Sequence, residues 1–392
     1  WSETYDRDLT DIFAIQDEIA HAITDALAIE LNLTEERQIP KTASTDNMEA
    51  YDHYLEAKGL IARRLDFERA IGLLKEVNEL DPGFAPGWAA GAQAHSLAIY
   101  YLVVDADEFK NTAESMARRA LEIDPNLASA YSVLGDVQRD RYEWSKAREN
   151  YLHALELNPD DSETNGQFAQ MLWRVSHFDE ALKYSARAID LDPLSWVNLT
   201  VHAALRYATG DRAGGWEDIQ KTLKIVGLYN FFPLRHGINM AISNGDIDRA
   251  IEMMTELSKS ETVNKFYPGT KAHIEKLAPL LKSKENTLAF LRKTIDPMAN
   301  EGSPDNWGTD LYWAAFYGDY ELAEAIFDNG TNSDARQGIL DTTWFNYPII
   351  NPLRNSAAYK RLVRKIKLDR FWRESGFPFN CRPIGDDDFA CN

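Results

Sequence analysis

Two cysteines, Cys381 and Cys391, carry the most specific chemistry that this sequence offers. They lie ten positions apart near the end of the 392-residue chain, around the acidic run 386–388. A disulfide between them would close a short loop and stabilise the fold by roughly 3 kcal/mol. Free thiols are the alternative, and a metal site is disfavoured because no second pair of ligands follows. The acidic run lacks the alternating spacing of a calcium loop, so we interpret it as a solvated tail.

The other nucleophiles, acids and bases form no catalytic motif in the sequence. The eight histidines are scattered, and His273-Ile274-Glu275 has the His-x-Glu of zinc deaminases without their Pro-Cys-x-x-Cys. The sequence contains no phosphate-binding loop, no dinucleotide fingerprint and no nucleophile elbow. We therefore expect no enzyme activity, no metal and no cofactor in these residues, and any catalytic domain would lie upstream of Trp1.

The net charge of the chain limits the classes of partner that it is expected to bind. A net charge of −20 argues against the phosphate backbone of nucleic acids, or an anionic membrane, as the main partner. No run of 18 apolar residues is present. Residues 354–373 hold eight Lys or Arg. We interpret this stretch as a solvated helix that leans on acidic helices, with a nucleic-acid patch as the alternative.

The helices expected to position any binding residue follow a sequence repeat of 34 residues. One copy opens with Tyr131, Leu134 and Gly135, and the closing prolines Pro159 and Pro193 lie one period apart. Small residues recur at the packing positions Ala147, Ala154, Ala181 and Ala188. Small residues at this spacing let two antiparallel helices approach closely, and the apolar side left over requires stacked neighbours. The pattern resembles the tetratricopeptide repeat.

The resemblance implies an all-α fold, a right-handed α-α superhelix of about eight helical pairs with an irregular C-terminal cap. We expect the superhelix over 48–330, with clear repeats at 48–82, 83–125, 126–159 and 160–193 and degenerate repeats over 194–330. The extra length of 83–125 is expected to place Tyr100 and Tyr101 near one rim. Residues 1–35 are interpreted as the remnant of an upstream domain that ends in an amphipathic helix, 36–47 as a linker, and 331–392 as a cap and tail.

Both ends of the chain resemble bacterial multidomain signalling proteins. The opening Trp-Ser-Glu-Thr-Tyr-Asp-Arg with residues 11–19, and the closing Phe-Trp-Arg-Glu-Ser-Gly before a late Cys, carry this resemblance. In that family a class III adenylate or guanylate cyclase domain, or a winged-helix domain, precedes a TolB-like domain and the repeats. The chain, which begins at Trp1 without Met, is thus expected to be a soluble bacterial fragment. It would be periplasmic if Cys381 and Cys391 are bonded and cytoplasmic otherwise.

A superhelix of this family offers a concave groove lined by the first helix of each pair. The groove positions of the family fall here on Ser132, Asp136, Arg139, Asp140, Gln170, Trp173, Arg174, Tyr207, Arg235 and Asn239. Trp173 is the most informative, because aromatic and Arg side chains dominate binding energy at interfaces. The alternative is that Trp173 packs against the next repeat.

We therefore predict a non-catalytic scaffold that binds a protein or peptide in this groove, the sensory or regulatory part of a signalling protein. It would contact neither nucleic acid nor membrane directly. Three alternatives stay open: the regulatory region of a nucleotide cyclase, the effector region of a winged-helix transcriptional regulator, and a self-assembly module that forms a homo-oligomer.

Overall fold

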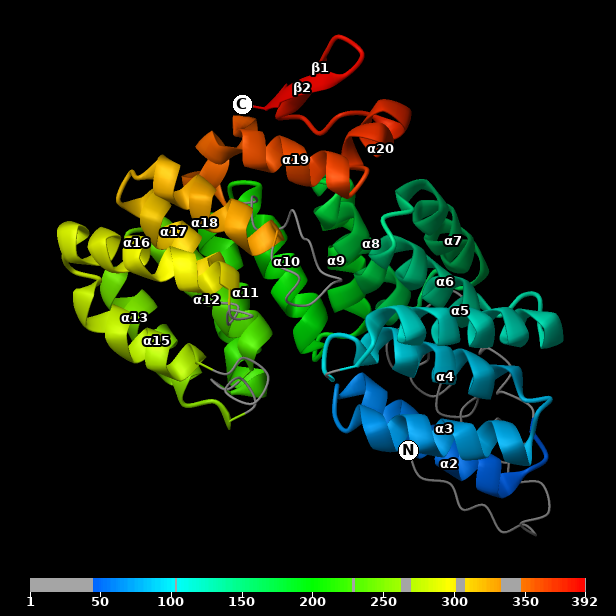
Figure 1. Ribbon diagram of the computed structural model, residues 1–392. Coiled ribbons are helices and arrows are strands. Elements are labelled where there is room, and N and C mark those ends of the chain that lie inside the picture. Colours follow the sequence, from blue (N-terminus) through cyan, green and yellow to red (C-terminus); the bar gives the residue numbers. More distant parts are fainter. Residues whose placement is uncertain are drawn as a thin grey trace, which may run out of the picture.

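Helices stacked in consecutive pairs make up most of the protein (Figure 1). The computed structural model describes residues 45–102, 104–227, 230–261, 269–300, 307–332 and 347–391. The expected remnant at 1–35 and all but the end of the linker at 36–47 lie outside these residues. No described helix is both long and apolar enough to cross a membrane.

Eight helical pairs follow one another in the described ranges, as the repeat predicts. They are α2 (Met48–Ala62) and α3 (Phe67–Leu80), α4 (Ala85–Ala98) and α5 (Ala106–Ile123), α6 (Ala128–Asp140) and α7 (Trp144–Leu157), α8 (Ser162–Arg174) and α9 (Phe178–Leu191), α10 (Trp196–Ala208) and α11 (Arg212–Val226), α12 (Phe231–Ser243) and α13 (Ile247–Ser258), α15 (Thr270–Leu277) and α16 (Lys284–Asn300), and α17 (Trp307–Phe316) and α18 (Tyr320–Asn332). The short 3-10 helix η2 (Ala278–Leu280) continues α15. The all-α superhelical class is confirmed.

The local sequence explains where these helices begin and how they pack. Asn47, Asp161 and Ser195 each accept a hydrogen bond from a backbone N–H of the first turn, which satisfies a group that the helix leaves unpaired. The repeated alanines Ala147, Ala154, Ala181 and Ala188 are at most 1% exposed. Their small side chains let the helices of neighbouring pairs approach closely, as the repeat requires.

The longer second repeat carries its extra residues between its two helices and in the second of them. Its extra residues form the segment 99–105 and lengthen α5. Tyr101 stacks on Phe67 with ring centroids 5.0 Å apart, and the Tyr100 hydroxyl donates to Asp140 Oδ2 at 2.7 Å. The hydroxyl of Tyr100 thus has a partner on α6 and the ring of Tyr101 has one on α3, while their position near a rim stays a prediction.

The end of the chain folds back on the superhelix. The 3-10 helix η4 (Pro348–Asn355) leads into α19 (Ala357–Lys365) and α20 (Leu368–Ser375), which lie across one side of the helical pairs in Figure 1. The buried apolar residues of this segment share one core with α7 to α18. The expected solvated helix is therefore a packed one. We attribute the difference to its apolar face, which includes Trp372, fully buried.

An antiparallel hairpin, which the sequence did not predict, closes the described chain. Strands β1 (Cys381–Ile384) and β2 (Asp388–Cys391) pair with Cys381 opposite Cys391, and a disulfide joins these two residues. The acidic run 386–388, expected to be a solvated tail, instead spans the turn and the first residue of β2. The carboxylate of Asp388 accepts hydrogen bonds from Lys360 at 2.7 Å and from Arg364 at 3.0 Å. These two basic residues of α19 therefore form ion pairs within the chain.

Candidate binding site

Most of the predicted groove residues lie inside the protein. Seven of them are buried: Ser132, Asp136, Arg139, Asp140, Trp173, Tyr207 and Asn239. The other three, Gln170, Arg174 and Arg235, are half-buried. The structure places seven of the ten in two groups, which we call the arginine cluster and the aromatic cluster, and leaves Ser132, Gln170 and Arg235 outside both.

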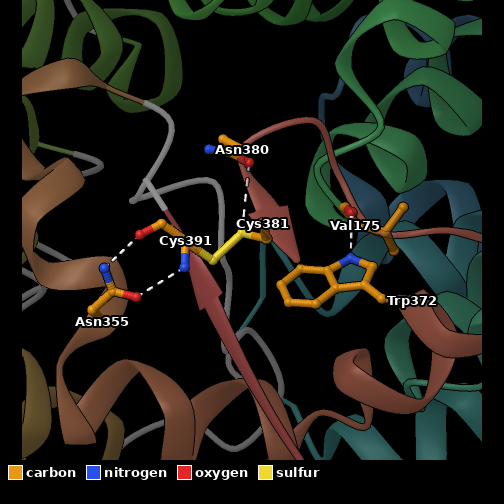
Figure 2. Close-up of a disulfide and its surroundings, with 6 residues drawn as sticks. All are labelled: Val175, Asn355, Trp372, Asn380, Cys381 and Cys391. Atoms are coloured by element: carbon orange, nitrogen blue, oxygen red, sulfur yellow. Dashed lines mark hydrogen bonds between the residues drawn. A yellow bond between two sulfur atoms is a disulfide. The ribbon is translucent and has the colours of Figure 1, made fainter. Parts of the chain in front are cut away.

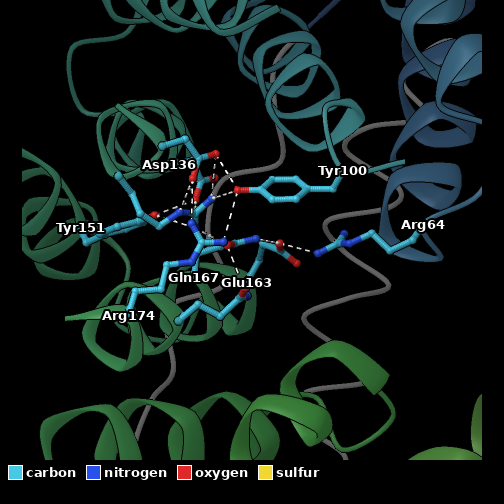
Figure 3. Close-up of polar contacts among 10 residues, drawn as sticks. Arg64, Tyr100, Asp136, Tyr151, Glu163, Gln167 and Arg174 are labelled. Atoms are coloured by element: carbon cyan, nitrogen blue, oxygen red, sulfur yellow. Dashed lines mark hydrogen bonds and ion pairs between the residues drawn. The ribbon is translucent and has the colours of Figure 1, made fainter. Parts of the chain in front are cut away.

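The arginine cluster consists of Arg64, Tyr100, Asp136, Arg139, Asp140, Tyr151, Glu163, Gln167 and Arg174 (Figure 3). Arg139, only 1% exposed, lies at its centre. Its Nη1 donates to Asp136 Oδ1 at 2.9 Å and to Gln167 Oε1 at 2.8 Å, and its Nε donates to Asp140 Oδ1 at 2.9 Å. The guanidinium is thus held by charged and polar partners on α6 and α8, as a buried charge requires.

Two residues that sequence reasoning missed connect this cluster to the first two helical pairs. Arg64, between α2 and α3, donates from Nη2 to Glu163 Oε1 at 2.6 Å, although the two residues are 99 positions apart. Its backbone adopts the left-handed region, with φ of 56°, which a non-glycine residue seldom does. Tyr100 reaches Asp140 from the segment before α5. The extra length of the second repeat was the available signal for Tyr100, and we find none for Arg64.

Burial and the three arginines shift the pKa values of the carboxylates in this cluster in two directions. Burial raises the pKa of Asp136 to about 6, against the opposing effect of Arg139. The pKa of Asp140 is lowered, because Arg139 and Arg174 together outweigh its burial. The pKa of Glu163 is likewise lowered by Arg64, again against burial. Asp136 is therefore the carboxylate in the cluster whose charge is most easily lost.

The aromatic cluster lies where α8, α10, α12 and α17 meet the residue before η4. It consists of Trp173, Tyr207, His236, Tyr312 and Tyr347, together with Asn239, which follows His236 by three residues on α12; all six are buried. Trp173 and His236 have ring centroids 5.3 Å apart, and His236 Nδ1 lies 2.8 Å from the Tyr347 hydroxyl. The Tyr347 ring in turn lies 5.5 Å from the rings of Tyr207 and Tyr312. Groups from five separated parts of the chain thus converge on one place.

Three side-chain atoms of the aromatic cluster are buried without a hydrogen-bond partner in the described residues. They are Trp173 Nε1, His236 Nε2 and Asn239 Oδ1. Burial, helped by the adjacent Arg235, holds the pKa of His236 well below its usual range, so this ring is neutral at pH 7. Leaving a buried donor or acceptor unpaired costs about 1–3 kcal/mol, and such groups in a native fold call for an explanation. A ligand that offers both a donor and an acceptor would match them.

The His-x-Glu stretch, compared in the sequence with zinc deaminases, lies in the described part of the chain. Within that part, no three His, Cys, Asp or Glu side chains are grouped so that they could hold an ion. His273, from the His-x-Glu stretch, instead has Nε2 3.0 Å from Asp310 Oδ1. The pKa of His273 is raised, because the Asp310 carboxylate outweighs its burial. We interpret this pair as a buried ionic contact between α15 and α17.

Comparisons with known proteins give similarity to one curated protein and to several solved structures. No family model matches the chain. Putative adenylate cyclase 3 of Rhizobium meliloti (strain 1021) is 38% identical over 92 residues, which cover 23% of this chain and 16% of that protein. The chain therefore matches only a small part of this relative.

Solved structures that are similar to the chain include the APC/C hetero-tetramer Cut9–Hcn1 and YrrB. The APC/C hetero-tetramer Cut9–Hcn1 is similar with a TM-score of 0.51 and 14% identity, over 80% of this chain and 55% of that chain. YrrB, described as a TPR protein with an unusual peptide-binding site, has a TM-score of 0.30 and 22% identity, over 47% of this chain and 90% of that chain. The 34-residue repeat and the stacked helical pairs confirm the resemblance to tetratricopeptide repeat proteins, and the chain has their all-α superhelical fold.

Proposed function

We propose that this chain is a non-catalytic scaffold that binds an extended segment of a partner protein at the aromatic cluster. The observation that carries the proposal is the set of unpaired atoms Trp173 Nε1, His236 Nε2 and Asn239 Oδ1. An extended peptide presents a backbone N–H and a C=O at every residue other than proline. Its carbonyl would accept from Trp173 Nε1, and its N–H would donate to Asn239 Oδ1.

In this proposal the structure is the closed form of the scaffold. Trp173 is 3% exposed and Asn239 is 2% exposed, so a partner reaches them only after neighbouring elements separate. The partner would then select a less populated open form, and its affinity would include the cost of opening. Access to the site is therefore expected to be controlled by the contacts that hold α8 and α12 in place.

The arginine cluster has a different role in the proposal. Arg139 was predicted to contact the partner, yet its guanidinium is fully engaged by Asp136, Asp140 and Gln167. A partner would have to replace these charged contacts to reach it. We therefore assign Arg139, Asp136 and Asp140 to holding the first four helical pairs at a set curvature. The partner would bind beside them.

Charge indicates the kind of partner. With a net charge of −20, the chain attracts basic segments and repels acidic ones over a distance of about 10 Å at moderate salt. A basic peptide is therefore expected to associate faster than an acidic one, and the difference should shrink as salt is added.

The test is a peptide selected from a random displayed library on the purified chain. We expect the double variant Trp173→Phe, Asn239→Leu to bind the selected peptide at least about 10-fold more weakly, since an unmade hydrogen bond at a buried site costs about 1–3 kcal/mol. Trp88→Phe is the matched control, because its indole N–H bonds locally to the Pro82 carbonyl oxygen. Unchanged affinity in the double variant would place the site elsewhere.

A second candidate is favoured by the similarity to a putative adenylate cyclase. We propose that the scaffold regulates a nucleotide cyclase domain encoded in the same gene. The product of the whole gene should then convert ATP to cyclic AMP, and the double variant Trp173→Phe, Asn239→Leu should change how that rate responds to the selected peptide. A gene product without cyclase activity would exclude this candidate and leave the scaffold proposal intact.

A further inference from the structure

The cap joins parts of the chain that a simple superhelix would keep apart. We call α19, α20 and the β1–β2 hairpin the clasp. Trp372 of α20 donates from Nε1 to the carbonyl oxygen of Val175 at 2.8 Å (Figure 2). In return, Trp144 of α7 donates from Nε1 to the carbonyl oxygen of Ile366 at 2.8 Å. Repeats in such proteins usually contact only their neighbours, so the clasp adds a constraint between distant repeats.

The clasp meets the candidate site at the end of α8. Val175 directly follows Trp173 and Arg174, the last residues of that helix. His177 adds a second contact, with Nε2 3.1 Å from the carbonyl oxygen of Gly376. Release of the clasp would therefore free the helix end that carries Trp173.

The disulfide supports the contact between Trp372 and Val175 through strand β2. Cys391 is 2% exposed, and its backbone N–H donates to Asn355 Oδ1 at 2.8 Å while its carbonyl accepts from Asn355 Nδ2. Phe389, on the same strand, places its ring edge-on to Trp372 with centroids 5.5 Å apart. Figure 2 shows the disulfide and the Trp372–Val175 bond on neighbouring parts of the clasp. The disulfide thus fixes strand β2 against β1. Strand β2 carries Phe389, and the Phe389 ring packs against Trp372.

We propose that the Cys381–Cys391 disulfide is a redox switch for the clasp, and through α8 for access to the aromatic cluster. The part that concerns partner access rests on the proposed function. The reductant is a dithiol. One of its thiolates attacks the sulfur of Cys381, forms a mixed disulfide and releases the Cys391 thiolate. Its second thiol then releases Cys381. The dithiol becomes a disulfide, and two electrons and two protons pass to the two cysteines.

Exposure favours attack at Cys381. This residue is half-buried, and the rest of β1 is exposed, whereas Cys391 is enclosed. A two-stranded hairpin of four residues a strand is marginal without a covalent link. Closure of so short a loop by a disulfide changes the opening equilibrium by about 100-fold. Reduction should therefore raise the open fraction of the hairpin by about that factor.

The test is hydrogen exchange of the full chain, read by mass spectrometry before and after addition of dithiothreitol. The double variant Cys381→Ser, Cys391→Ser is the reference for the open state and should not respond to the dithiol. We expect reduction to speed exchange in 385–391 about 100-fold and also to speed it in 170–178. Trp372→Phe, with the disulfide intact, should speed exchange in 170–178 alone.

Three results would overturn the switch: no change on reduction, faster exchange confined to the hairpin, or loss of the helical circular dichroism signal. The last result would make the bridge a general stabiliser of the fold. No partner is present in this experiment, so its failure would leave partner binding untouched. Absence of any peptide binding would equally leave the switch standing.

Discussion

The indole N–H of Trp372 donates to the carbonyl oxygen of Val175, with 2.8 Å between nitrogen and oxygen. Val175 is the C-cap residue of α8, and carbonyl groups at a helix end have no partner within the helix. The clasp therefore satisfies a group that α8 leaves unpaired and buries Trp372 completely. This contact joins the end of the chain to the helix that carries the proposed binding residue Trp173.

Replacing Trp372 by Phe should destabilise the fold by about 1–3 kcal/mol, because the ring stays but the buried Val175 carbonyl loses its donor. Urea unfolding followed by circular dichroism measures this change. Trp88→Phe should cost less than about 1 kcal/mol, since the carbonyl of Pro82 is exposed and can bond to water. Equal losses in the two variants would show that the clasp contact contributes nothing of its own.

Arg139→Met should be among the most damaging single substitutions, with a loss of about 3–5 kcal/mol. The change leaves the buried carboxylates Asp136 and Asp140 without their central cation. Arg118→Met is the matched control, because Arg118 pairs with Glu114 on the surface with its side chain 61% exposed and such pairs contribute less than about 1 kcal/mol. A loss at Arg139 as small as the control would argue against a structural arginine cluster.

The carboxyl of Asp136 should make stability depend on pH. Burial raises its pKa from 3.8 to about 6, so between these values the folded chain binds more protons than the unfolded chain. Its contribution to the free energy of unfolding is thus present below about pH 4 and lost as pH rises through 6. Asp136→Asn cannot titrate.

We therefore expect the stability of the wild type relative to Asp136→Asn to fall by up to about 3 kcal/mol between pH 4 and pH 7. Urea unfolding of both proteins at a series of pH values gives this difference. The lowered pKa values of Asp140 and Glu163 act below this window and are common to both proteins. A difference that stays constant, or grows with pH, would show that the pKa of Asp136 is not raised.

Replacing either of two helical glycines by alanine should change the stability of the fold, in opposite directions. At Gly135 a Cβ would lie 2.9 Å from the ring of Tyr151, which is held by a hydrogen bond to Asp136. Gly135→Ala should therefore cost about 1–3 kcal/mol. At Gly72 no atom lies within 4 Å of the added Cβ, so Gly72→Ala should stabilise the chain by up to about 1 kcal/mol.

Thermal unfolding of these two variants tests the packing that the 34-residue repeat implies. A Gly135→Ala variant as stable as the wild type would mean that α6 and α7 are not as close as described.

The helical pairs were predictable because their packing is local. Small residues such as Ala147 and Ala181 recur one period apart, and each pair contacts mainly the next one. Contacts between distant positions leave no such periodic trace. Arg64 reaches Glu163 across 99 residues, and neither the repeat nor the composition singles out Arg64.

The candidate site was predicted only in part, for the same reason. Family positions named Trp173 and Asn239 as groove residues, but they could not show that Tyr347 would pack beside Tyr207 and His236. The hairpin was missed because the run 386–388 carries three acidic residues in a row. Pairing of Asp388 with Lys360 and Arg364 offsets that charge.

The most direct test of the account is the indole N–H resonance of Trp173 in a nitrogen-15 NMR spectrum, recorded with and without the selected peptide. The chain has ten tryptophans, and the signal of Trp173 is assigned by its loss in Trp173→Phe. Peptide binding at the aromatic cluster should shift this resonance downfield, as its proton gains an acceptor, while the signal of Trp88 stays in place. Saturating peptide that leaves the Trp173 resonance unmoved would contradict the proposed site.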